Sequence, residues 1–182
     1  MQVTDFVLQL AETAPKITDL IKLGLSPADA QSLIDCSVIV PRITALPIGF
    51  TSTDALNTLV ELVSLYDVSK LEIGVISFLE APADYGSYLQ VAKVELDPLV
   101  IYRNGEIRVV DWQSLAHYMW KCARNSALFL EALIMTNRFL TMTMLQADIY
   151  EDEEYALETA SVIARVAGGN EYLSFYQMLF GV

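Results

Sequence analysis

The sequence predicts an α+β domain in which an antiparallel β-meander packs against helices, with extra helices at the C-terminal end. Three patterns indicate this class: β-rich alternation within residues 71–94, an Asn-Gly turn between two apolar runs, and helical spacing of apolar side chains after Asn125. A chain of 182 residues has the size of one domain. Its expected parts are a mainly helical N-terminal part, the antiparallel sheet and a helical C-terminal part, which cover residues 1–70, 71–112 and 113–182.

Two helices are expected near the N-terminus. The first covers residues 5–12, with Thr4 as its N-cap. The second begins at Ser26, which is followed by a proline in the first helical position. Asp29 can return a hydrogen bond as the acid of a capping box, and the helix should end near Asp35.

The chain between these helices and the sheet combines extended structure with one more helix. Residues 37–48 hold Val and Ile around two prolines, which predicts extended chain but not a central strand. A third helix is expected to open at Thr53-Asp54 and to end near Leu65, because apolar side chains then follow at helical spacing.

The sheet is predicted from β-rich segments separated by turn signals. Residues 71–79 and 88–94 each indicate one strand, and residues 80–87 between them indicate a loop. Apolar runs at 99–102 and 107–110 flank an Asn-Gly pair. Because Asn and Gly tolerate the positive φ angles of a type I′ turn, these runs should form a β-hairpin.

After Trp112 the sequence predicts a helical C-terminal part. Asn125-Ser126 caps a helix that is apolar on most sides and should lie buried against the sheet. Another helix follows an acidic run and should end at Gly168-Gly169. The apolar face expected for this helix consists of Tyr155, Thr159, Val162, Ile163 and Val166.

The charge of the chain excludes some classes of partner. Its 23 acidic against 11 basic residues give a net charge of −12. Affinity for nucleic acid comes mostly from Lys and Arg, so we expect neither direct nucleic-acid binding nor docking on an anionic membrane. A basic protein partner is favoured, since complementary charge speeds encounter, although acidity also serves solubility.

Two further features predict a cytoplasmic location. The N-terminus lacks the basic and apolar regions of a signal peptide. The most apolar long segment, residues 126–145, contains Glu131, Asn137 and Arg138, which a membrane span rarely tolerates at its centre.

The sequence contains no motif with a catalytic mechanism. Nucleotide-binding glycine motifs, GxSxG, HExxH and metal-type Cys/His spacings are all missing, and Cys36 and Cys122 stand far apart. The one histidine, His117, lies in a helix-like segment crowded with large side chains and is interpreted as structural or surface-exposed. We therefore expect a non-enzymatic protein without cofactor or metal. The alternative is a small carboxylate-based hydrolase or ligand-binding protein, with Glu72, Glu80, Asp84, Glu95 and Asp97 as candidate carboxylates.

Exposed acidic segments supply the candidate partner-binding residues. The acidic run at 148–154 has a structural explanation, because negative side chains at a helix N-terminus interact favourably with the helix dipole. It would also form a contact patch for a basic partner. The candidate residues are Asp84, Tyr85, Asp148, Glu151, Asp152, Glu153 and Glu154.

An aromatic tail at residues 172–180 has two interpretations. Its aromatic side chains recur about once per helical turn, as in a helix that packs on a core. The same pattern suits the seam of a homodimer, so both a monomer and a structural homodimer subunit stay open.

Residues 97–110 resemble the central hairpin of the SUKH superfamily. The helix start at Asn125-Ser126 is similar to the one that follows this hairpin in the family, and residues 71–74 are similar to the preceding strand. The resemblance covers roughly residues 20–135. It implies an α+β fold and a bacterial immunity protein that neutralises a toxin, such as a basic nuclease, by direct binding.

Overall fold

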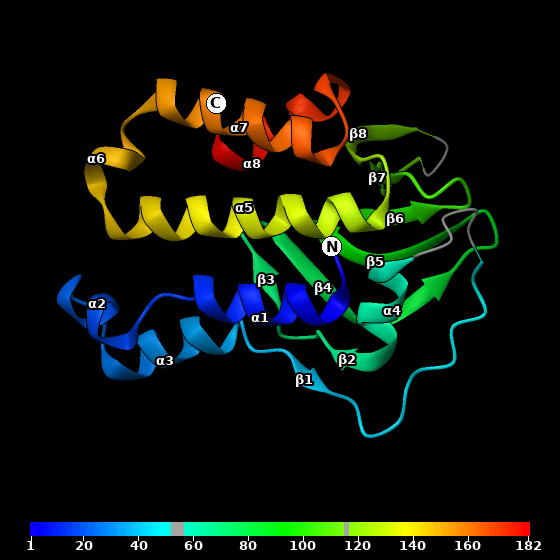
Figure 1. The fold of residues 1–182 in the computed structure, drawn as a ribbon, viewed down its shortest axis with the longest axis horizontal. Helices are drawn as coiled ribbons and strands as arrows, with labels where there is room; N and C mark the ends of the chain where they lie inside the picture. Colours follow the sequence, from blue (N-terminus) through cyan, green and yellow to red (C-terminus); the bar gives the residue numbers. More distant parts are fainter. Residues whose placement is uncertain (52–56, 115–116) are drawn as a thin grey trace.

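Six strands form one antiparallel sheet whose spatial order follows the sequence, and helices cover one of its faces (Figure 1). The computed structural model describes residues 1–51, 57–114 and 117–182. The predicted α+β class and its meander are confirmed. The strands are β3 (Glu72–Ile73), β4 (Ile76–Asp84), β5 (Tyr88–Val94), β6 (Asp97–Tyr102), β7 (Ile107–Val110) and β8 (Tyr118–Ala123).

The N-terminal helices match the prediction only where a cap determines the start. In α3 (Pro27–Asp35), Ser26 Oγ accepts a hydrogen bond from the Asp29 amide at 3.2 Å, as predicted. α1 (Val3–Thr13) begins before Thr4, so the predicted cap is wrong. Burial of Val3 in the core accounts for the earlier start, since burying such a side chain outweighs the roughly 1 kcal/mol of a cap. The short helix α2 (Ile17–Lys22) was not predicted.

The connection to the sheet is extended, as predicted. β1 (Val40–Pro41) pairs with β2 (Tyr66–Asp67) in a separate two-stranded sheet. Between them, α4 (Thr58–Leu65) ends at the predicted residue. The predicted start of this helix at Thr53-Asp54 lies outside the described residues.

The segment predicted as one strand over residues 71–79 is a tight hairpin instead. β3 and β4 pair at Ile73 and Ile76, and Gly74 turns the chain with a φ of +59°. A Cβ atom at Gly74 would lie 3.0 Å from Leu140 Cδ1, so the turn packs directly on the helix that contains Leu140.

β4 then continues to Asp84 through much of the predicted loop at 80–87. Its pairing with β5 resumes after a bulge, at Ala83 and Gln90. Because β3 has only two residues, this part of β4 forms the edge of the sheet. A proline is tolerated there, since its missing N–H interrupts no hydrogen bond between strands.

The hairpin between β6 and β7 is confirmed, but its turn differs from the predicted type I′. Among the described non-glycine residues only Glu95 has a positive φ, so Asn104 does not adopt the left-handed conformation. Gly105 does, with a φ of +88°, and its amide donates to the Tyr102 carbonyl at 2.9 Å. This is the pattern of a three-residue loop with glycine at the left-handed position.

The predicted boundary between sheet and helical part at residues 112 and 113 is wrong, because β8 extends the sheet beyond β7. Trp120 and Cys122 lie two residues apart, so both face the helices, and Cys122 is fully buried. His117 precedes this strand, is exposed and does not belong to a helix.

α5 (Ser126–Leu145) lies across the sheet between α1 and the C-terminal helices (Figure 1). Asn125 caps it as predicted, with Oδ1 accepting from the Leu128 amide at 3.0 Å. By length and composition α5 is the one helix in the described part of the chain that could cross a membrane, a test that core helices of soluble proteins also pass. Phe129, Ala132, Leu133 and Thr136 of this helix are buried.

The C-terminal helices are α6 (Ala147–Tyr150), α7 (Glu153–Ala167), the 3₁₀ turn η1 (Asn170–Tyr172) and α8 (Leu173–Phe180). Tyr172, Phe175 and Tyr176 are buried within the chain, which confirms core packing of the aromatic tail and rules these three out of a dimer seam. The predicted apolar face of α7 is largely wrong. Its buried side chains are Ala156, Ala160, Ile163, Ala164 and Ala167.

Replacing Tyr176 with Phe should destabilise the fold. The fully buried hydroxyl of Tyr176 donates to the Cys122 carbonyl at 2.8 Å, and its loss leaves that acceptor unpaired. We expect the free energy of unfolding in urea to fall by about 1–2 kcal/mol. Tyr150→Phe, at a side chain that is 77% exposed, should leave it unchanged.

The same variant should alter stability at alkaline pH. Burial raises the pKa of Tyr176 well above its ordinary value, so the unfolded chain releases this proton first as pH rises. The contribution of the protonated phenol is present below the unfolded pKa of about 10 and is lost as pH rises beyond it. Stability of the native chain should therefore fall more steeply above about pH 10 than that of Tyr176→Phe. Parallel profiles would contradict this assignment.

Gly168→Ala should destabilise the chain by about 1–3 kcal/mol more than Gly24→Ala. Both glycines have positive φ angles, +126° and +94°. A Cβ atom at Gly168 would lie 2.8 Å from Arg124 Cβ, whereas one at Gly24 would meet nothing within 4 Å. Thermal unfolding of the two variants separates this steric clash from the backbone strain that both share.

Candidate functional site

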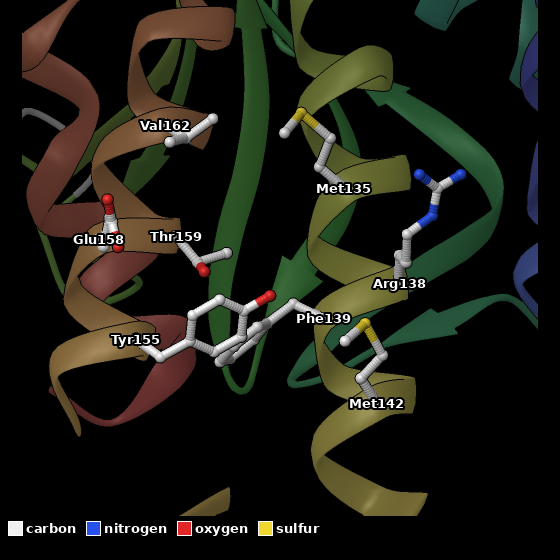
Figure 2. A pocket seen from close by; sticks show the side chains of 8 residues that line it. All are labelled: Met135, Arg138, Phe139, Met142, Tyr155, Glu158, Thr159 and Val162. Carbon is white, nitrogen blue, oxygen red and sulfur yellow. The ribbon is translucent and has the colours of Figure 1, made fainter. Parts of the chain in front are cut away.

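An apolar groove with a volume of about 300 Å³ runs between α5 and α7 (Figure 2). We call it the α5–α7 groove. On each helix its lining residues recur at positions i, i+3, i+4 and i+7, so each wall is two helical turns long. The lining consists of Met135, Arg138, Phe139 and Met142 from α5 and Tyr155, Glu158, Thr159 and Val162 from α7.

The groove results from the way α7 packs. Its alanines, including Ala156 and Ala160, point into the core and allow the helix to lie close to its neighbours. Tyr155 and Thr159 each precede one of these alanines by one residue, which rotates them about 100° to the flank of the helix. Figure 2 shows Thr159 and Val162 pointing from α7 toward α5. Larger side chains therefore line an open seam instead of filling the core.

Phe139 forms the fixed floor of the groove. It is only 5% exposed, and its ring centroid lies 4.2 Å from that of Phe180 and 5.9 Å from that of Tyr155. Met135 and Met142 stand one turn to either side of it. Because methionine is flexible and polarisable, these two side chains can adapt to an apolar group of varied shape.

The two rims of the groove carry opposite charges. Arg138 stands on the α5 rim and points away from α7 in Figure 2, while Glu158 stands on the α7 rim. Both are exposed. Glu154 lies one turn before Glu158 on α7 and is exposed as well, so carboxylates follow the α7 rim toward its N-terminus.

Five of the predicted partner-binding residues lie at this end of the groove, and all are exposed. Asp152 also has a structural role, because its carboxylate caps α7 by accepting from the Tyr155 amide at 2.9 Å. Glu151 and Glu153 line a neighbouring hollow of about 500 Å³ that shares Phe139 with the groove. The five residues are Asp148, Glu151, Asp152, Glu153 and Glu154.

Asp84 and Tyr85 lie elsewhere. Asp84 ends β4 and Tyr85 follows it, beside the β6–β7 turn, where Arg103 Nε donates to the Gly86 carbonyl at 2.6 Å. The chain direction places this turn near the start of α5, whereas the acidic run follows its end. α5 has 20 residues and so is about 30 Å long, which means that the two predicted sets do not form one patch.

Tyr85 belongs instead to a ladder of rings on the sheet face opposite the helices. Its ring centroid lies 5.1 Å from that of Tyr88, which lies 5.8 Å from that of Tyr102. The Arg108 guanidinium continues the ladder between Tyr102 and Tyr118, at 4.9 and 4.7 Å from their ring centroids. Glu106 pairs with Arg108, so this cation is held within the protein.

Two of the five carboxylates proposed for hydrolysis accept hydrogen bonds from backbone amides. Asp84 Oδ1 accepts from the Gly86 amide at 2.7 Å, and Asp97 Oδ1 accepts from the Trp112 amide at 3.1 Å. Within the described residues, no group of three or more His, Cys, Asp or Glu side chains could hold a metal ion. No two of these carboxylates are shown to form a catalytic pair, so the hydrolase alternative stays a prediction.

No family model matches the chain, and neither a curated protein nor a solved structure matches it. The resemblance to the SUKH superfamily therefore stays a prediction.

The α5 wall of the groove was not predicted from the sequence, whereas Tyr155, Thr159 and Val162 of the α7 wall were predicted as part of an apolar helix face. The signal that could have located the groove is the series of alanines in α7, spaced four, four and three residues apart. Such a series indicates the face of closest approach, which leaves the larger side chains beside it at the edge. The series is Ala156, Ala160, Ala164 and Ala167.

Proposed function

We propose that the chain is a non-enzymatic protein-binding module that takes a basic protein partner at the α5–α7 groove. The observation that carries this proposal is an apolar groove with a buried aromatic floor and exposed carboxylates along one rim. Stable protein interfaces have the same anatomy, with an apolar centre inside a polar rim.

The partner chemistry follows from the charge. A chain with a net charge of −12 attracts basic proteins and repels nucleic-acid and anionic lipid surfaces. The acids at the start of α7 would contribute to encounter, while Phe139 and its two neighbouring methionines would hold the partner once it has docked. No cofactor is required for this role.

We further propose that the partner is a toxin domain and that the chain acts as an immunity protein in the bacterial cytoplasm. The resemblance of residues 97–110 to the SUKH hairpin supports this identity. Nucleases present basic surfaces to phosphate, which complements an acidic inhibitor. An inhibitor of this kind acts by covering its target, so the missing catalytic motifs agree with the role.

The immunity role predicts that a toxin gene lies beside the gene for this chain. Co-expression of the chain with that toxin domain should restore growth of a bacterial host, because bound toxin cannot reach its target. Colony counts with and without the chain measure the effect. A genomic neighbourhood without a toxin gene, or unrelieved toxicity, would contradict the immunity role.

Neutralising the acids beside the groove should slow association with the toxin domain. For the combined variant Glu151→Gln, Glu153→Gln and Glu154→Gln, we expect the association rate constant to fall about tenfold at low salt and the dissociation rate constant to change less than about twofold. Surface plasmon resonance at several salt concentrations measures both.

The matched control changes the net charge equally at exposed sites elsewhere. Glu61→Gln, Glu72→Gln and Glu80→Gln together should reduce the association rate constant by less than about twofold, because these exposed side chains line no part of the groove. Equal slowing by both triple variants would show that only the overall charge matters and that the groove is not the docking site.

A further inference from the structure

The groove has the dimensions of a seat for one more helix. Met135 to Met142 and Tyr155 to Val162 each cover eight residues, and their ends lie about 10 Å apart along the helix. α5 and α7 run side by side in opposite directions (Figure 1), so their exposed ridges form a trough along both axes. A third helix packs into such a trough by placing its own ridge of side chains between theirs.

The spacing of the lining residues also determines which positions of a bound helix contact the groove. A helix that follows a trough two turns long presents side chains at i, i+3 or i+4, and i+7 to it. Phe139 at the floor and the methionines on either side call for apolar side chains at these positions. A groove of about 300 Å³ accommodates a few such groups and lies at the lower end of ligand-pocket sizes.

The rims determine the flanks of that helix. One flank would run beside Glu154 and Glu158, and the other beside Arg138. Lysine or arginine on the first flank would complement the α7 rim, and their long stems would cover apolar surface beneath the charge. The complementarity therefore favours a helix that is basic along one side and apolar at its centre.

We infer that the occupant of the α5–α7 groove is an amphipathic α-helix of the partner, with apolar anchors at i, i+3 or i+4, and i+7 and with basic side chains along the flank that faces α7. The inference rests on the proposed function and adds to it the secondary structure and the charge pattern of the bound segment.

The test uses synthetic helical peptides of about 18 residues labelled with fluorescein. The first peptide has leucines at i, i+4 and i+7 with lysines beside them. The second has the same composition, but its lysines lie on the side opposite the leucines. The third has a central proline that prevents helix formation. The first should bind in fluorescence polarisation, and the other two should bind about tenfold more weakly or not at all.

Two pairs of protein variants locate the contact. Thr159→Tyr fills the groove and should abolish binding of the first peptide, whereas Ser161→Tyr, on the outer side of α7, should leave it unchanged. Glu158→Lys should weaken binding about tenfold, against less than about twofold for Glu61→Lys on α4. Thermal unfolding verifies that all four variants fold.

A reciprocal exchange provides a readout that a structural role of Glu158 would not give. A peptide in which glutamates replace the flanking lysines should bind poorly to the native chain and about tenfold better to Glu158→Lys. Equal binding of all peptides, or an unchanged affinity in Thr159→Tyr, would overturn the inference. So would a native homodimer in sedimentation that Thr159→Tyr converts to a monomer, because the groove would then hold a second copy.

The outcomes separate this inference from the proposed function. If the native chain binds the toxin domain and both Thr159→Tyr and Glu158→Lys bind it equally well, the helix inference fails and the proposed function stands. If the native chain does not bind the toxin domain, the proposed function fails whatever the peptides do.

Discussion

Burial of α5 is the constraint on which the rest of the structure depends. Asn137 donates from Nδ2 to Thr13 Oγ1 at 2.9 Å and so joins α5 to α1, while Leu140 meets the β3–β4 turn at Gly74. On the opposite side, Phe139 stacks on Phe180 of α8. Because one helix contacts all three parts of the chain, it is apolar almost all round. The side chains that no neighbour covers become the wall of the groove.

The parts of this fold that the sequence could predict are set by local chemistry. Ser26 and Asn125 each accept a hydrogen bond from an amide in the first turn of a helix, and each lies where a cap was predicted. β8 could not be predicted in the same way. Its six residues suit a short helix or a strand equally, and only pairing with β7, which is non-local, decides between them.

The candidate site likewise has one part that the sequence could predict and one part that it could not. Exposed acids are visible in a sequence as a run of charge, so Glu151, Glu153 and Glu154 could be named before the fold was known. The apolar wall could not, because Met135 and Phe139 differ from core residues only in how closely α7 approaches them. Tyr85 shows the converse, since its neighbours Tyr88 and Tyr102 come from other strands and make it part of a ring ladder.

The acids near the groove have different roles. One of them stabilises the start of α7, and the others are available to bind a partner. Asp152 is held by the amide it caps, so its charge is already used by α7. Glu153 and Glu154 gain only the modest, salt-screened stabilisation that a helix N-terminus gives to nearby anions. The same helix start thus needs one acid for folding and leaves the others available for a partner.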